Sequence, residues 1–217
     1  MSAIMQTIGG RFGVRRWRLL PALCLVALLA AFCPFSACAM DFELNAIPGS
    51  NDARVLSMLG RIVPGDFNRL ADFEKPHPTF GRVILNSEGG NVFEAVRLAE
   101  LIHGEGDVVI VPDGAVCVSA CFLLFAAGRN RVAGPTASIG VHSVSVSVSG
   151  DETPAALGLT TSLARVAAAY GVPPSIIRKL VTTPPGRITW LSRADLTSMG
   201  VKVMSWKLPP TKSQPQR

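Results

Sequence analysis

The sequence has few of the residues that build metal centres, with only three histidines and five cysteines. These residues are scattered, and no spacing typical of a zinc or iron site recurs among them. The chain also has no internal repeat, and its longest apolar stretch is short for a membrane span. We therefore predict no metal site and no repeat architecture.

A strong excess of basic residues is also missing once the N-terminal segment is set apart. Four of the 21 Lys and Arg residues, but none of the 15 Asp and Glu residues, lie in the first 39 positions. The rest of the chain therefore has a net charge of about +2, and the sequence pI near 9.4 depends on that segment. The charge gives no reason to expect a nucleic-acid partner.

The first 39 residues have the pattern of a secretory signal. Arginines precede the apolar stretch LLPALCLVALLAAF, and residues 37–39, ACA, match the small-x-small pattern that signal peptidase recognises. We expect residues 1–39 to be removed on export to the periplasm or beyond, residues 40–208 to form one domain, and residues 209–217 to be a disordered tail. Two alternatives attach the protein to a membrane: an uncleaved signal, or a lipid on Cys38, where FSAC loosely resembles a lipobox.

Two cysteines, Cys117 and Cys121, remain after the signal is removed. An oxidising compartment permits a disulfide between them. If both lie on one helix at positions i and i+4, their β-carbons are too far apart to bridge without distortion. We therefore expect two small buried thiols.

Short apolar runs alternate with amphipathic segments along the chain. The pattern predicts strands at 55–63, 81–86, 107–112 and 137–150, and helices at 66–73, 92–104, 115–127, 161–170, 173–181 and 192–200. This order predicts an α/β domain with a largely parallel sheet. In such sheets, sites form at the carboxyl ends of the strands.

Ser119 is the only polar residue in the run AVCVSACFLLFAA, residues 115–127. One interpretation is a buried serine bonded to a backbone carbonyl. The other is a nucleophile near the start of a helix. A glycine pair, Gly89–Gly90, follows another predicted strand, where it either makes a tight turn or lets the backbone approach a ligand closely.

Three segments in order resemble the proteolytic subunit of the Clp protease and its relatives in the Clp/crotonase superfamily, most closely the exported ClpP-like proteins of bacteria. They are VILNSEGGNVFEAVRLAELI, CVSACFLLFAAG and GPTASIGVHSV. The resemblance covers roughly residues 59–203. It implies a ClpP/crotonase-like α/β fold of repeated strand-strand-helix units with a largely parallel sheet.

The resemblance also implies a set of site residues. Ser119 would be the nucleophile and His142 its general base, since a serine hydroxyl needs an adjacent base to become reactive. The backbone N–H groups of Gly90 and Ala120 would form the oxyanion hole that stabilises the tetrahedral intermediate.

The resemblance breaks at the third member of the triad. The Clp peptidase has an aspartate where GRITWLSRADL has Ile188, which cannot orient an imidazole. Thr189 is the adjacent alternative, and a Ser-His dyad is another. Asp195 has the spacing of a helix capping box, which accounts for it without catalysis, and Asp151 and Glu152 are remoter options.

The expected function is an exported serine peptidase that hydrolyses peptides or unfolded proteins, for which no cofactor is needed. The alternative is a catalytically inactive ClpP-like protein that binds peptides or takes part in an assembly, and the missing aspartate favours it. A crotonase-type acyl-CoA enzyme is disfavoured because coenzyme A is a cytoplasmic cofactor. Because Clp-type subunits form rings, the resemblance also admits a homo-oligomer.

Overall fold

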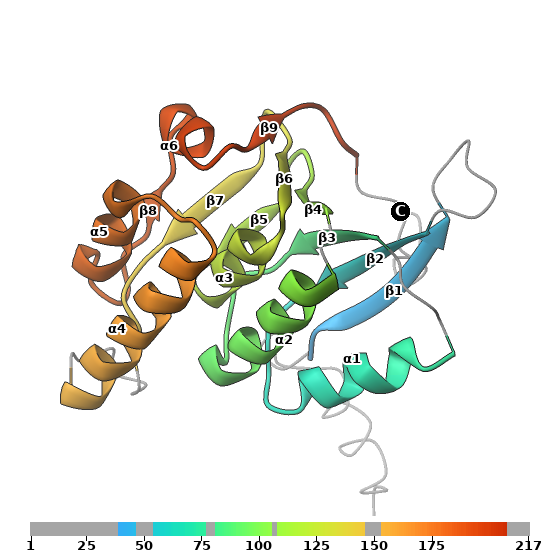
Figure 1. The fold of residues 1–217 in the computed structure, drawn as a ribbon, viewed down its shortest axis with the longest axis horizontal. Coiled ribbons are helices and arrows are strands. Elements are labelled where there is room, and N and C mark those ends of the chain that lie inside the picture. Colours follow the sequence, from blue (N-terminus) through green and yellow to red (C-terminus); the bar gives the residue numbers. More distant parts are fainter. Residues whose placement is uncertain (1–38, 47–53, 77–80, 106–107, 146–152, 208–217) are drawn as a thin grey trace, which may run out of the picture. The chain divides into compact units, whose positions relative to one another are not determined.

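Six strands form the main sheet, in the order β1-β2-β3-β4-β6-β9 (Figure 1). β1 runs antiparallel to β2, and all other neighbours are parallel. The strands are β1 (Asp41–Ala46), β2 (Arg54–Leu59), β3 (Arg82–Asn86), β4 (Val108–Val111), β6 (Asn130–Ala133) and β9 (Lys202–Val203). The predicted α/β domain with a mostly parallel sheet is thereby confirmed.

The structure is a computed structural model that describes residues 39–46, 54–76, 81–105, 108–145 and 153–207. All of them belong to one unit of the chain, residues 37–217. The expected signal peptide, apart from Ala39, and the expected C-terminal tail lie outside the described residues.

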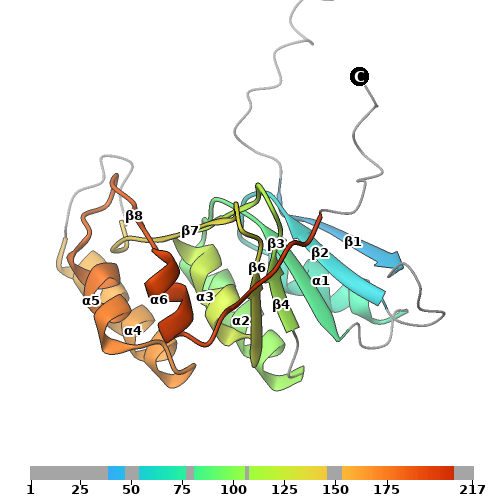
Figure 2. The same ribbon diagram turned by 90° about the horizontal axis from the view of Figure 1, so that it is seen from above.

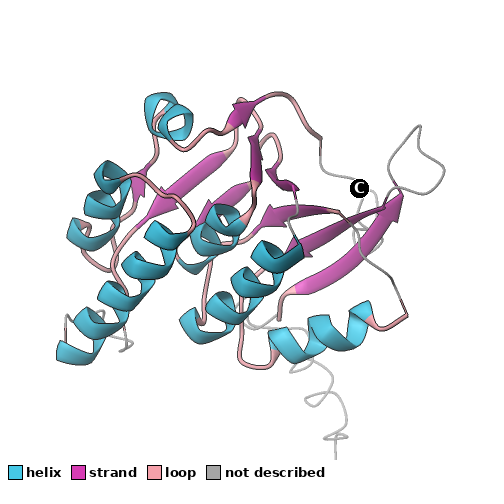
Figure 3. Ribbon diagram, in the orientation of Figure 1, coloured by secondary structure: helices cyan, strands magenta, loops and turns pink. Residues whose placement is uncertain are grey.

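Three further strands form a small second sheet in the order β5-β7-β8. They are β5 (Val116–Val118), β7 (Ser138–Val141) and β8 (Thr189–Trp190). Figure 3 shows the helices beside the two sheets; they are α1 (Asp66–Glu74), α2 (Val92–Glu105), α3 (Ala120–Ala127), α4 (Pro154–Ala169), α5 (Pro174–Thr182) and α6 (Arg193–Ser198). Because α2 follows a single strand, β3, the order of the elements does not confirm a repeated strand-strand-helix unit, which stays a prediction.

The central strands place apolar residues on both faces of the main sheet. Ile84, Ile110 and Val132 are aligned across β3, β4 and β6 and form a small cluster on one face. Their neighbour Leu85 belongs to the large core on the other face. Since successive side chains of a strand point to opposite faces, strands that are apolar throughout are what a sheet buried on both sides requires.

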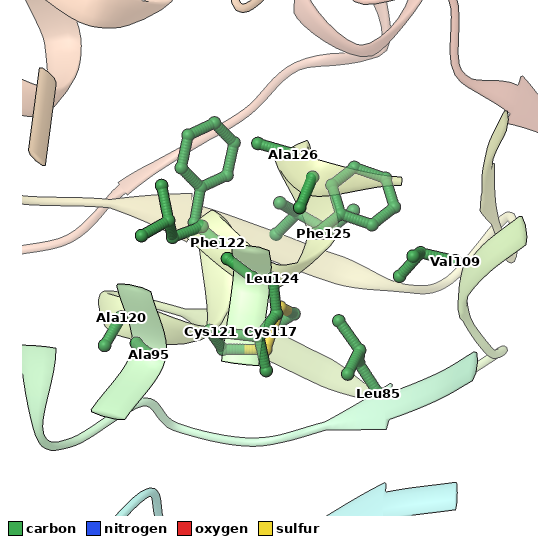
Figure 4. Close-up of a cluster of buried hydrophobic side chains, with 14 of the residues drawn as sticks. Leu85, Ala95, Val109, Cys117, Ala120, Cys121, Phe122, Leu124, Phe125 and Ala126 are labelled. Atoms are coloured by element: carbon green, nitrogen blue, oxygen red, sulfur yellow. A yellow bond between two sulfur atoms is a disulfide. The ribbon is translucent and has the colours of Figure 1, made fainter. Parts of the chain in front are cut away.

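Every residue of α3 is buried. The helix lies between α2 and α4 (Figures 1 and 2), and it packs against β4, β5 and β7. Figure 4 shows Phe122 and Phe125 of α3 in one cluster with Leu85 of β3 and Ala95 of α2. A helix that is apolar all round must be covered on every side. This explains why no polar residue follows Ser119 in the run.

The pattern predicts one helix over the apolar run 115–127, and this prediction is wrong. The first part of the run is the strand β5. Residues Val116, Cys117 and Val118 pair in parallel with Ser138–Gly140 of β7. Periodicity alone does not separate a short buried strand from a buried helix, but the two β-branched valines favour the strand. Ser119 therefore lies at a strand-to-helix junction.

Other departures concern short or irregular elements. The strands β1, β6, β8 and β9 are absent from the prediction, and β8 and β9 have only two residues each, too few to show a period. In the described part of the expected strand 137–150, the strand is β7, and residues 146–150 lie outside the described residues. α4 begins at Pro154, earlier than the expected Thr161, because the Thr153 hydroxyl accepts a hydrogen bond from the N–H of Ala156 and caps it.

Arg131 of β6 joins the C-terminal ends of three helices. Its guanidinium donates to the carbonyl of Ala126 in α3 at 2.6 Å, that of Tyr170 after α4 at 2.5 Å and that of Met199 after α6 at 2.9 Å. These carbonyls lack intrahelical donors and carry partial negative charge, so a cation stabilises them. Burial lowers the pKa of Arg131, yet an arginine stays charged at neutral pH.

Replacing Arg131 by Met should lower the free energy of unfolding by about 2–4 kcal/mol, because three carbonyls at helix ends lose their donor. Urea unfolding measures the difference. Arg129→Met is the matched control: Arg129 is exposed, and its loss should change the value by less than about 0.5 kcal/mol. Equal unfolding midpoints for the two variants would contradict this account of the helix ends.

Candidate active site

Ser119 makes the turn between β5 and α3 with an unusual backbone conformation. Its φ of 59° and ψ of −128° make it the one non-glycine residue with positive φ in the described part of the chain. Such a conformation costs about 1–3 kcal/mol and is concentrated at functional sites. The hydroxyl neither caps α3 nor bonds to a backbone carbonyl among the described residues. The alternative interpretation, a buried serine bonded to a carbonyl, therefore does not describe Ser119.

Pairing between β5 and β7 carries Ser119 and His142 to the same end of the small sheet. Val118 pairs with Gly140 in the parallel ladder, and the N–H of Ser119 still donates to the carbonyl of Gly140 at 3.2 Å. Ser119 is thus one residue, and His142 two residues, beyond the last pair. Both follow the carboxyl ends of parallel strands, where sites of α/β proteins form.

Both residues line one pocket of about 330 Å³. Its other lining residues are Arg61, Glu88, Gly90, Val92, Ala120, Val144, Ser145 and Leu163. The described residues include no hydrogen bond between Ser119 and His142; such bonds are often long in unliganded sites. Arg61 and Glu88, both exposed, line the pocket but were not among the predicted site residues. The sequence around Arg61 contains no motif that would indicate a role in a site.

The imidazole of His142 is held by the backbone beside it. Its Nδ1 lies 2.7 Å from the carbonyl oxygen of Ser143. Since a carbonyl only accepts, Nδ1 must carry the proton in this hydrogen bond, which leaves Nε2 as the acceptor in the neutral ring. The two residues that follow His142 are also anchored: Ser143 donates its N–H to the carbonyl of Thr183 at 2.8 Å, and Val144 donates its N–H to the hydroxyl of Thr160 at 2.9 Å.

The glycine pair passes close to the turn at Ser119. A β-carbon on Gly89 would lie 2.6 Å from the carbonyl oxygen of Val118 and 2.8 Å from Cβ of Ser119. On the other side, Ile62 donates to the carbonyl of Gly89 and accepts from the N–H of Asn91, each at 2.9 Å. Because neighbouring residues of an extended segment point in opposite directions, the N–H of Gly90 is turned away from Ile62.

The predicted third member, Thr189, pairs with Val141 beside His142, but its hydroxyl bonds elsewhere. The hydroxyl of Thr189 lies 2.7 Å from the hydroxyl of Thr183, and the structure describes no contact of Thr189 with the imidazole. Ile188 is 41% exposed, and its methyl group fills the space where Gly140 lacks a side chain. Asp151 and Glu152 lie outside the described residues.

Asp195 caps α6, as its spacing predicts. Its carboxylate accepts from the N–H of Ser192, whose hydroxyl accepts from the N–H of Asp195, and this completes a capping box. It also forms an ion pair with Lys179 at 2.6 Å. Burial alone would raise the pKa of Asp195, but the hydrogen bonds from Lys179 and Ser192 outweigh it and lower the pKa. The carboxylate of Asp195 therefore has a structural role, in the cap of α6 and in the ion pair with Lys179.

Cys117 and Cys121 form a disulfide, which corrects the expectation of two buried thiols. The expectation assumed that both lie on one helix, whereas Cys117 lies in β5 and Cys121 in α3. The turn at Ser119 brings their α-carbons to 5.2 Å, within the range that a disulfide spans. The sequence signal lies in Val116 and Val118, because these β-branched residues favour a strand at Cys117.

Two features are absent from the part of the chain that the structure describes. It contains no group of three or more His, Cys, Asp or Glu side chains placed to hold a metal ion. Within the same residues, none of the helices has the length and apolar character needed to cross a membrane.

Comparisons with known proteins point to one fold. The family model described as Clp protease matches residues 80–170, and no curated protein matches the sequence. A mutant of the 1510-N membrane-bound stomatin-specific protease superposes with a TM-score of 0.50 at 18% identity, over 68% of this chain and 76% of that one. A ClpP1 mutant from Listeria monocytogenes gives 0.54 at 17% identity, over 70% and 92%.

The structural neighbours show that the fold is ClpP-like. The match of residues 80–170 to the Clp protease model supports a serine peptidase, a hydrolase of the ClpP type.

Replacing Gly89 by Ala should lower the free energy of unfolding by about 2–4 kcal/mol, because the new β-carbon meets backbone at a positive φ. Gly158→Ala is the matched control, since Gly158 lies in α4 with open space around it, and the change should stabilise the protein by about 0.5–1 kcal/mol. Thermal or urea unfolding gives both values. A shift of the same sign in both variants would contradict the close approach at Ser119.

Proposed function

We propose that the protein is an exported serine peptidase that hydrolyses peptide bonds through a Ser119–His142 pair. The observation that carries the proposal is the backbone of Ser119. A non-glycine residue with φ of 59° at the start of a fully buried helix turns its hydroxyl away from the cap position. The residue borders the same pocket as His142.

The hydrogen bond between His142 and Ser143 supports the role of the imidazole as base. With the proton on Nδ1, the lone pair of Nε2 is free to accept the proton of the Ser119 hydroxyl. The carbonyl of Ser143, 2.7 Å from Nδ1, thereby fixes the tautomer, a task that an aspartate performs in a Ser-His-Asp triad. The imidazole can therefore be oriented although Ile188 stands where the Clp peptidase has its aspartate.

Two backbone N–H groups support an oxyanion hole. Ala120 is the first residue of α3, so its N–H has no partner within the helix, and Gly90 donates to no other described group. Both residues line the pocket with Ser119. Each donor in such a hole contributes about 3–4 kcal/mol to stabilising the transition state.

The reaction follows from these roles. The oxygen of Ser119 attacks the peptide carbonyl carbon while its proton passes to Nε2 of His142, and the oxyanion forms at Gly90 and Ala120. The C–N bond then breaks and the amine takes the proton from His142. Water attacks the acyl-enzyme, gives its proton to His142, and the product acid leaves as Ser119 regains its hydrogen.

The walls of the pocket combine charged, polar and apolar groups, as a site that holds a peptide requires. Val92, Val144 and Leu163 supply apolar surface, while Arg61 and Glu88 supply charges for polar groups of a backbone. A volume of about 330 Å³ is at the lower end for small-ligand pockets and suits one or two side chains. We propose peptides or unfolded proteins as substrates, with further copies of the chain as assembly partners.

Two observations support export. The pattern of residues 1–39 is that of a secretory signal. In addition, disulfides persist in oxidising compartments and are rare in the cytosol, and Cys117 is bonded to Cys121. The periplasm or the outside of the cell is the proposed location.

Labelling with a fluorophosphonate probe tests the proposal. The wild-type protein should form a covalent adduct at Ser119 with loss of fluoride, and none should form in Ser119→Ala. In His142→Gln, labelling should slow by about 100-fold or more because general-base catalysis contributes a factor of that size. Ser162→Ala is the matched control, as this serine is exposed on α4, and its labelling should equal that of the wild type.

A folded wild-type protein that does not label would contradict the peptidase. It would favour the alternative, a ClpP-like protein without catalysis that binds peptides or assembles. Circular dichroism of each variant separates loss of reactivity from loss of the fold.

A further inference from the structure

The disulfide between Cys117 and Cys121 encloses the turn at Ser119. Cys117 is two residues before Ser119 and Cys121 two residues after it. We infer that this disulfide is a positioning element for the nucleophile: it holds the backbone of Ser119 in the conformation that presents its hydroxyl to the pocket. The inference rests on the proposed function, because it assigns the disulfide a task in that site.

The two ends of the enclosed loop are held by different elements. On the strand side, Cys117 pairs with Ile139 of β7 and Val118 with Gly140. On the helix side, the N–H of Phe122 donates to the carbonyl of Ser119 at 3.0 Å. An extended chain from residue 117 to 121 would span about 13 Å, whereas the α-carbons of the two cysteines are 5.2 Å apart. The chain must therefore reverse at the residues between them.

The disulfide opposes the simplest relaxation of this turn. Without a covalent link, Ser119 could return to a negative φ if the start of α3 moved away from β5. Gly89 packs against Cβ of Ser119 from one side and blocks movement in that direction only. The bond between the sulfurs prevents Cys121 from moving away from Cys117, so the strand end and the helix start stay together.

The disulfide acts beneath the site and outside the pocket. Both cysteines are fully buried, and Figure 4 shows them inside the apolar cluster near Leu124 and Leu85. Neither belongs to the residues that line the pocket. Its loss should therefore change the reactivity of Ser119 and leave reversible binding in the pocket unchanged.

The experiment compares the full-length wild type, oxidised or reduced with a phosphine, with Cys117→Ala/Cys121→Ala. The concentration dependence of fluorophosphonate labelling gives two quantities, the reversible affinity for the probe and the limiting rate of adduct formation. We expect the limiting rate to fall roughly 10- to 100-fold in the reduced wild type and in the double variant, as small misplacements of reacting groups do. The affinity should stay unchanged, and the phosphine should have no effect on the double variant.

Mass analysis of tryptic peptide 98–129 verifies the redox state, because it contains both cysteines and no others. If the double variant does not fold, the reduced wild type decides, since reduction breaks the bond and leaves both side chains in place. Free thiols in the freshly purified exported protein would overturn the inference. So would a limiting labelling rate that is the same in the reduced and the oxidised wild type after verified reduction, or loss of the whole fold on reduction. No labelling of the oxidised wild type overturns the proposed function instead, while equal labelling with and without the disulfide leaves that function intact.

Discussion

The passage from β5 to α3 at Ser119 is the constraint on which the site depends. The positive φ of this one residue sets the direction of the hydroxyl, starts the helix at Ala120 and brings the two cysteines together. The strain of such a conformation is about 1–3 kcal/mol. Burial of Phe122 and Phe125, each with 1% or less exposure, contributes about 1.5–3 kcal/mol per side chain. The packing of α3 is therefore sufficient to offset the strain.

A backbone carbonyl orients the imidazole of His142, whereas a Ser-His-Asp triad uses a carboxylate for this task. The carbonyl of Ser143 fixes the tautomer, and its segment is held by Thr183 and Thr160. A carbonyl carries only partial charge, so it stabilises an imidazolium less than a carboxylate does. On the proposed function, the pair is suited to slower acyl transfer than a full triad, and the position of Ile188 is free to pack against Gly140.

Residue pattern was sufficient for the α/β class, the parallel sheet and the capping box of α6, because these depend on period and local hydrogen bonds. It placed the glycine pair after one strand and Ser119 after the next, and the parallel bridge between Ser87 and Cys117 brings the two segments together. It was insufficient for β5, since a three-residue apolar strand has no distinguishing period. The disulfide was missed for the same reason, as its geometry follows from Cys117 being in a strand. The Ser143 carbonyl carries no side-chain signal at all.

A crystal structure of the fluorophosphonate adduct tests the central claim most directly, because it shows the nucleophile and the oxyanion hole together. The account predicts phosphorus bonded to the oxygen of Ser119 and a phosphonyl oxygen about 3 Å from the backbone nitrogens of both Gly90 and Ala120. It also predicts that Nδ1 of His142 stays on the carbonyl of Ser143. An adduct on another serine, or a phosphonyl oxygen that points away from both nitrogens, would contradict the account.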